Sequence, residues 1–175
     1  MRSFIGIPLN NNTQDEIYKI YPQIKNLRFT KKENLHITVK FLGEVKEEGI
    51  GKIKKIIEES CSDLEKFKIS CNRLSSFPTL SSARVIWVNV IEGAKIIEKI
   101  YNKLEEKLGK LGFQTENRKY IPHITIARAK NTVDITDYLK TFEINSTAES
   151  IVLYKSDLKP GGPVYTKIFE FNFKG

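Results

Sequence analysis

One tetrapeptide, present in two copies, carries the side chains of this chain that are best suited to chemistry. HITV begins at His36 and HITI begins at His123, and these are the only two histidines among the 175 residues. Each histidine has a threonine two positions later, Thr38 or Thr125, and the copies lie about half a chain length apart. This repetition indicates a duplicated site rather than two unrelated histidines.

The β-branched residues of both copies predict strands. In a strand, side chains two positions apart share a face, so each copy presents an imidazole beside a hydroxyl. Imidazole transfers protons near neutral pH, and a hydroxyl donates hydrogen bonds to phosphate oxygens. Two such strands facing each other predict a site with two proton-transfer groups, His36 and His123, and two phosphate-binding hydroxyls, those of Thr38 and Thr125.

A metal site and a structural role in the core are two other uses of paired histidines. Two histidines without a third histidine, cysteine or carboxylate at ligand spacing make a poor zinc site. The two cysteines, Cys61 and Cys71, form neither a CxxC nor a Cys/His pattern. We therefore expect no metal and no cofactor. If the histidines were hydrogen-bonded core residues, and the threonines only good strand formers, the repetition would have no explanation.

Composition limits the classes of protein to consider. The formal charge of +8 and pI near 9.4 fit a polyanionic partner such as RNA, although a lysine-rich surface is also common in soluble proteins. The chain has no run of 18 apolar residues and no signal-peptide pattern at its start, so we expect no membrane association. With two reduced, structural thiols, these features favour a cytoplasmic protein. We expect it to be a monomer.

The elements around the motifs repeat in the same order: helix, HIT strand, helix, strands. Helices are predicted from residue 12 or 13, from 45 and from 93, with a short one over 134–139; strands are predicted over 2–8, 27–29, 35–42, 67–74, 84–91, 123–128, 142–154 and 164–173. The repeat predicts an α+β fold that is a two-lobed, pseudo-symmetric duplication. Antiparallel sheets would face a central cleft, with helices on the outer faces. We expect residues 1–175 to form a single bilobal domain of two interleaved halves.

Arg128 ends the second motif and is a further candidate for binding phosphate, ranked below the four motif residues. Simple alternation places it on the face opposite His123 unless the strand bulges. Phe41 stands at the matching place of the first copy, and alternation puts Lys40 on the face of His36.

Several other side chains have two interpretations, one structural and one functional. Trp87, Tyr120 and Tyr154 either pack in the core or stack on a base. Arg84, Arg118 and Lys159 are either solvated surface or RNA contacts.

The segments HITVKFLGEV, from His36, and RKYIPHITIAR, from Arg118, resemble the 2H phosphoesterase superfamily. Within it, the chain is similar to the RNA 2′,3′-cyclic phosphodiesterases first named 2′-5′ RNA ligases. RSFIGIPL, FPTLSSARVIWVNV and LYKSDLKPGGPVYTKI resemble further family landmarks, so the resemblance covers nearly the whole chain. It implies metal-independent hydrolysis of a 2′,3′-cyclic phosphate to a 2′-phosphomonoester, with His36 as acid and His123 as base.

The resemblance implies RNA with 2′,3′-cyclic phosphate ends as substrate, tRNA fragments among the candidates, or cyclic nucleotides. Two alternatives stay open. A 2′-5′ RNA ligase would run the same chemistry in reverse, but the chain has neither a Walker A pattern nor a KxxG context for energy-coupled ligation. A non-catalytic RNA-end binding protein would need positive charge but would have no need of paired imidazoles.

Overall fold

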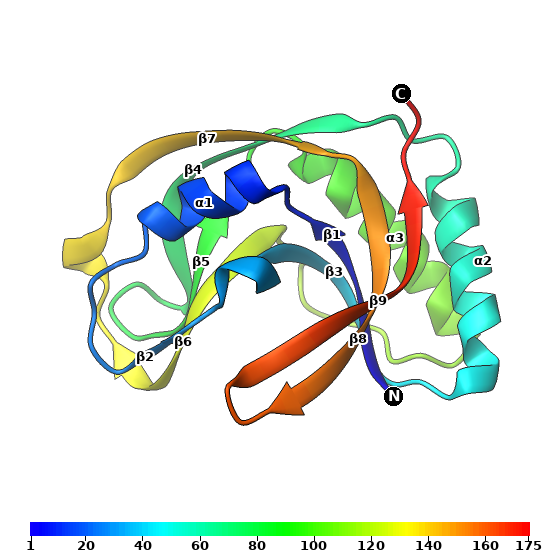
Figure 1. Ribbon diagram of the computed structural model, residues 1–175, viewed down its shortest axis with the longest axis horizontal. Helices are drawn as coiled ribbons and strands as arrows, with labels where there is room; N and C mark the ends of the chain where they lie inside the picture. Colours follow the sequence, from blue (N-terminus) through cyan, green and yellow to red (C-terminus); the bar gives the residue numbers. More distant parts are fainter.

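Two antiparallel sheets organise the computed structural model, which describes residues 1–175 (Figure 1). The first sheet has the order β3-β1-β8-β9, with β1 Arg2–Pro8, β3 His36–Glu44, β8 Ser150–Lys159 and β9 Gly162–Asn172. The second has the order β2-β6-β5-β4-β7, with β2 Leu27–Phe29, β4 Phe67–Pro78, β5 Ala83–Asn89, β6 His123–Val133 and β7 Thr141–Ala148. The predicted α+β class with antiparallel sheets is confirmed, and each sheet contains one motif strand.

Three α-helices flank the sheets: α1 Asn11–Lys19, α2 Ile50–Cys61 and α3 Ala94–Lys110. The side chain of Asn10 caps α1 by accepting a hydrogen bond from the Thr13 amide at 2.8 Å. Single turns of 3₁₀-helix lie at Lys32–Asn34, Glu47–Gly49 and Thr136–Tyr138, the last within the short helix predicted over 134–139. No helix has the length and apolar content needed to cross a membrane.

The two sheets exchange helices. Helix α1 follows β1 of the first sheet but packs against β7 of the second. Helix α3 follows β5 of the second sheet but packs against β3 of the first, and α2 packs against α3 and β9. Each half of the chain therefore covers part of the other half, which interlocks the two motif strands.

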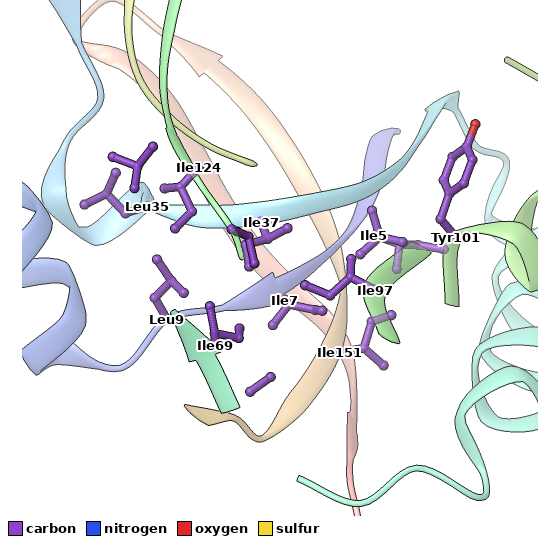
Figure 2. Close-up of a cluster of buried hydrophobic side chains, with 14 of the residues drawn as sticks. Ile5, Ile7, Leu9, Leu35, Ile37, Ile69, Ile97, Tyr101, Ile124 and Ile151 are labelled. Atoms are coloured by element: carbon purple, nitrogen blue, oxygen red, sulfur yellow. The ribbon is translucent and has the colours of Figure 1, made fainter. Parts of the chain in front are cut away.

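The core is continuous between the two sheets. Figure 2 shows Ile5 and Ile7 of β1 and Ile37 of β3 clustered with side chains of the second sheet, including Ile69 of β4 and Ile124 of β6. All five are at most 1% exposed. Because such interiors are close-packed, this core holds the motif strands in a fixed relation.

The prediction of one strand over 142–154 is wrong. The chain forms two strands there, β7 in the second sheet and β8 in the first, with Glu149 between them. β7 buries side chains on one face only, whereas the first half of β8 is buried on both faces. In the first sheet β8 is a central strand, between β1 and β9. Both segments read as β-branched strand, so residue type alone does not show where the chain changes sheet.

Candidate active site

The first motif strand bulges at the fourth motif residue. In the pairing of β1 with β3, Thr38 lies opposite Gly6 and Lys40 lies opposite Ile5, so Val39 is an extra residue without a partner. A β-bulge of this kind shifts the in–out alternation of the strand by one residue.

The second motif strand bulges at the equivalent residue. In the pairing of β5 with β6, Thr125 lies opposite Trp87 and Ala127 opposite Ile86, which leaves Ile126 as the extra residue. The two motifs thus share a bulge as well as a sequence, and the residues that follow each motif change face in the same way.

The bulge at Val39 decides which side chain follows Thr38 on the His36 face. The expectation that Lys40 lies there is wrong. Lys40 is 3% exposed, forms an ion pair with Glu105 of α3 and donates a hydrogen bond to the Gln114 carbonyl at 2.6 Å. Phe41, which is 60% exposed, takes the place beside the motif instead.

The bulge at Ile126 places Arg128 where it can act on the site. Its side chain is exposed. Burial lowers the pKa of His123 and the positive charge of Arg128 lowers it further, whereas burial raises the pKa of Tyr165 and the same charge opposes that rise. Sequence reasoning named a bulge as the condition for this placement, and that condition is met. The two halves are therefore unlike: a guanidinium follows the second motif and a phenyl ring the first.

Backbone carbonyls fix the proton positions on both imidazoles. His36 Nδ1 lies 2.6 Å from the Asn34 carbonyl, and His123 Nδ1 lies 2.7 Å from the Ile121 carbonyl. A carbonyl only accepts, so Nδ1 carries the proton in each neutral ring and Nε2 offers its lone pair. The Thr38 hydroxyl, 2.8 Å from His36 Nε2, must then donate to it. In both motifs Nε2 is the nitrogen available for proton transfer.

Aromatic side chains hold the His36 ring. Its centroid is 4.9 Å from that of Phe4 and 5.4 Å from that of Tyr165, which meets it edge-on. A Cβ at Gly6 would lie 3.0 Å from the Ile37 carbonyl oxygen and 3.2 Å from His36 Cδ2, so a side chain here would press on the imidazole. Tyr154, a candidate for base stacking, is 8% exposed and stacks on Phe4, which assigns it to packing.

The His123 ring has a similar setting in the second sheet. Phe77 meets it edge-on at 5.3 Å, and Trp87 lies at 5.5 Å. Trp87 is 7% exposed, so packing against the histidine, rather than stacking on a base, is its role in this structure. Both imidazoles are thus backed by aromatic rings, which restrict their rotation.

Two hydroxyl groups tie the motifs together. Tyr120, three residues before His123, donates a hydrogen bond to the Thr38 carbonyl at 2.8 Å. Thr30, six residues before His36, donates from its hydroxyl to the Thr125 carbonyl at 3.1 Å. Each motif threonine is therefore held through its backbone by the segment that leads into the other motif. Sequence reasoning left Tyr120 open and missed Thr30, because a bond between distant segments has no local sequence signal.

The electrostatic setting favours neutral imidazoles in the free protein. Burial lowers the pKa of His36 to about 4, although the Asn34 carbonyl opposes this shift, and the neighbouring charge of His123 lowers it further. Burial and the charge of Arg128 also lower the pKa of His123. Near pH 7 both rings can therefore accept a proton.

The lowered pKa of His36 predicts a loss of stability in acid. An unfolded histidine takes up a proton near pH 6.5, whereas folded His36 does so near 4, so protonation favours unfolding over that interval. The free energy of unfolding, measured in urea, should include the whole contribution of neutral His36 above pH 6.5. It should fall by roughly 1 to 3 kcal/mol as the pH is lowered to 4. His36→Gln, which does not titrate, should lose less over the same interval, and an equal loss in both proteins would contradict the assignment.

Solved structures share this fold. A Thermus thermophilus protein superimposes with a TM-score of 0.85 at 24% identity, covering 100% of this chain and 99% of its own. Escherichia coli LigT, solved with 3′-AMP, superimposes with a TM-score of 0.84 at 23% identity, covering 99% and 98%. The fold thus places the chain in the LigT-like class of structures.

Sequence comparison gives the family. The model of the 2′-5′ RNA ligase superfamily matches residues 18–160. An RNA 2′,3′-cyclic phosphodiesterase of Methanocaldococcus jannaschii is 39% identical over 98% of this chain and 100% of its own length. One of Methanothermobacter thermautotrophicus is 30% identical over 98% of each. The chain belongs to the 2′-5′ RNA ligase superfamily, and the resemblance seen in its sequence is confirmed.

Proposed function

We propose that the chain hydrolyses the 2′,3′-cyclic phosphate ends of RNA to 2′-phosphomonoesters, with His36 and His123 as its proton-transfer groups. The observation that carries the proposal is a pair of imidazoles on β3 and β6, strands of the two different sheets that contact each other, each with Nδ1 on a carbonyl and Nε2 left to react. The full-length relatives named RNA 2′,3′-cyclic phosphodiesterase support this substrate class.

The reaction needs a proton removed on one side of phosphorus and supplied on the other. His123 Nε2 takes a proton from water as the water oxygen bonds to phosphorus. The bond from phosphorus to the 3′ oxygen breaks, and that oxygen takes a proton from His36 Nε2. His36 must be charged for this step, and the negative phosphodiester favours its imidazolium form when the substrate binds. The product keeps the phosphate on the 2′ oxygen.

Thr38 has two hydrogen-bonding roles in this scheme. In the free protein its hydroxyl donates to His36 Nε2. When that nitrogen takes up a proton, the hydroxyl turns to donate to a phosphate oxygen. Thr125 supplies the equivalent hydroxyl, and the Arg128 guanidinium adds positive charge where negative charge develops on phosphorus.

Removal of either hydroxyl should slow turnover without unfolding the protein. Thr38→Val and Thr125→Val keep the strand preference, and the bonds from Tyr120 and Thr30 survive because both go to backbone carbonyls. Each change should lower kcat by roughly 10- to 10³-fold, the effect of losing a transition-state donor. Thr141→Val, an exposed strand position of β7, is the matched control. Unchanged turnover in both motif variants would assign the threonines to the sheet alone.

The direct test is a nucleoside 2′,3′-cyclic phosphate incubated with the protein and excess EDTA, with the position of the product phosphate determined by ³¹P NMR. We expect the product to carry a 2′-phosphate, and we expect the rate with EDTA to equal the rate without it. Loss of activity with EDTA, restored by one divalent ion, would contradict a two-imidazole mechanism. Binding without turnover would indicate an RNA-end binding protein. A joined product on addition of 5′-hydroxyl RNA would indicate ligation.

A further inference from the structure

A cavity of about 380 Å³ lies beside His36. Its walls come from the end of β1, the segment that leads into β3 and the β8–β9 hairpin, which reaches away from helices α2 and α3 in Figure 1. Among the four motif residues only His36 borders it. The volume is within the range of small-ligand pockets, and no step of the hydrolysis described above uses it.

Asn34 lines this cavity together with His36. Its side chain is 9% exposed and donates a hydrogen bond to the Pro163 carbonyl, in the hairpin, at 2.9 Å. Its own carbonyl accepts the Nδ1 proton of His36. One residue thus joins the hairpin to the imidazole, so the cavity has a preformed shape beside the His36 ring.

The geometry of the displacement points the ribose towards this cavity. In an in-line reaction the attacking water and the leaving oxygen lie on opposite sides of phosphorus. With His123 beside the water and His36 beside the 3′ oxygen, the ribose that bears this oxygen lies on the side of His36. The cavity is the space that borders His36, so the terminal nucleoside has room there.

Charges at the mouth of the cavity suit a further phosphate. Lys31 and Lys167 line it, with Glu33 as the opposing carboxylate. Lys167 is paired with Glu170 at 3.0 Å, and the neighbouring Lys32 with Asp15 at 2.8 Å. Lys31 is exposed and forms no ion pair, and its Nζ lies 3.5 Å from where a Cβ of Gly161 would stand, over the turn of the hairpin. It is the free cation at this mouth.

We propose that the cavity holds the nucleotide that carries the cyclic phosphate, and that Lys31, with Lys167, binds the phosphate on the 5′ side of that nucleotide. This rests on the proposed function and goes further, because it names the part of RNA that the site recognises. A cyclic nucleoside lacks a 5′-phosphate, whereas the end of an RNA strand has one. The cavity thus selects RNA ends over cyclic nucleosides.

The test compares two substrates that differ only in this group: cytidine 2′,3′-cyclic phosphate with and without a 5′-phosphate. Lys31→Gln should lower kcat/KM about 3- to 10-fold on the 5′-phosphorylated substrate, the scale of one exposed charge contact, and leave the other unchanged. Glu33→Gln removes the opposing charge and should raise kcat/KM on the 5′-phosphorylated substrate only. Lys55→Gln, at a side chain on α2 that is 75% exposed, is the matched control and should change neither.

The outcomes separate this inference from the proposed function. An equal loss on both substrates would show that Lys31 supports the fold or the reacting groups and would overturn the inference. If Lys31→Gln left kcat/KM unchanged on both substrates, the 5′-phosphate would not be bound there. If Glu33→Gln lowered kcat/KM on the 5′-phosphorylated substrate, the charge argument would be contradicted. In each case hydrolysis by the unmodified protein would still stand. Absence of hydrolysis of both substrates by that protein would instead overturn the proposed function.

Discussion

Replacing His123 with alanine should lower kcat/KM on a 2′,3′-cyclic phosphate by about 10²- to 10⁴-fold, and replacing His36 should cause a similar loss. This is the range for one positioned acid or base. In each ring Nδ1 is bonded to a backbone carbonyl, so Nε2 is the nitrogen that transfers the proton, and alanine removes it. Initial rates on a cyclic nucleotide give the effect directly.

Loss of packing has to be separated from loss of proton transfer. His36 contacts Phe4 and Tyr165, and His123 contacts Phe77 and Trp87, so alanine also leaves space beside aromatic rings. Glutamine fills more of that space and keeps a hydrogen-bonding group, but it transfers no proton near neutral pH. We expect the glutamine variants to be as slow as the alanine variants and closer to the wild-type protein in thermal stability. Activity within tenfold of wild type in any of them would refute a direct role.

The double variant gives a further check. Two groups that transfer protons in one transition state act as a unit, and removing both costs less than the product of the two single losses. The double variant His36→Ala/His123→Ala should therefore lose much less kcat/KM than the product of the two single fold-losses. If the two losses multiplied, the histidines would be acting independently, which the proposed mechanism does not allow.

The sequence was sufficient for the parts of the site that depend on local pattern. The HxT spacing placed each imidazole beside a hydroxyl, and the β-branched neighbours Ile37 and Ile124 are fully buried, as alternation predicts. The order of helices and strands gave the α+β class with antiparallel sheets. These features follow from the two-residue period of a strand and the 3.6-residue period of a helix, which neighbouring residues encode.

Other features depend on pairing between distant segments and were beyond the sequence. The bulges at Val39 and Ile126 exist only relative to β1 and β5. The first reverses the faces of Lys40 and Phe41, and the second reverses the face of Arg128. The change of sheet at Glu149 is equally a matter of which strand lies alongside. A one-residue shift in register moves every following side chain to the other face, so a small error in pairing becomes a large error in the composition of the site.

A change of leaving group should separate the roles of the two histidines. With p-nitrophenol as the leaving group, the departing oxygen needs little protonation, so much of the contribution of an acid is lost. On such a phosphodiester, His36→Ala should recover much of its 10²- to 10⁴-fold loss, while His123→Ala should stay slow because water must still be deprotonated. Recovery of His123→Ala instead would reverse the assignment.

The pH dependence gives the same assignment by a second route. The acid must be charged and the base neutral, so kcat/KM should follow a bell whose two apparent pKa values belong to the pair. Because the pKa values of His36 and His123 are both lowered in the free protein, the centre of the bell should lie below pH 6.5. In His36→Ala acting on the p-nitrophenyl substrate, the alkaline limb should disappear because no imidazolium is needed, while the acid limb should remain because His123 must be neutral. An alkaline limb that persists there would show that the acid is a group other than His36.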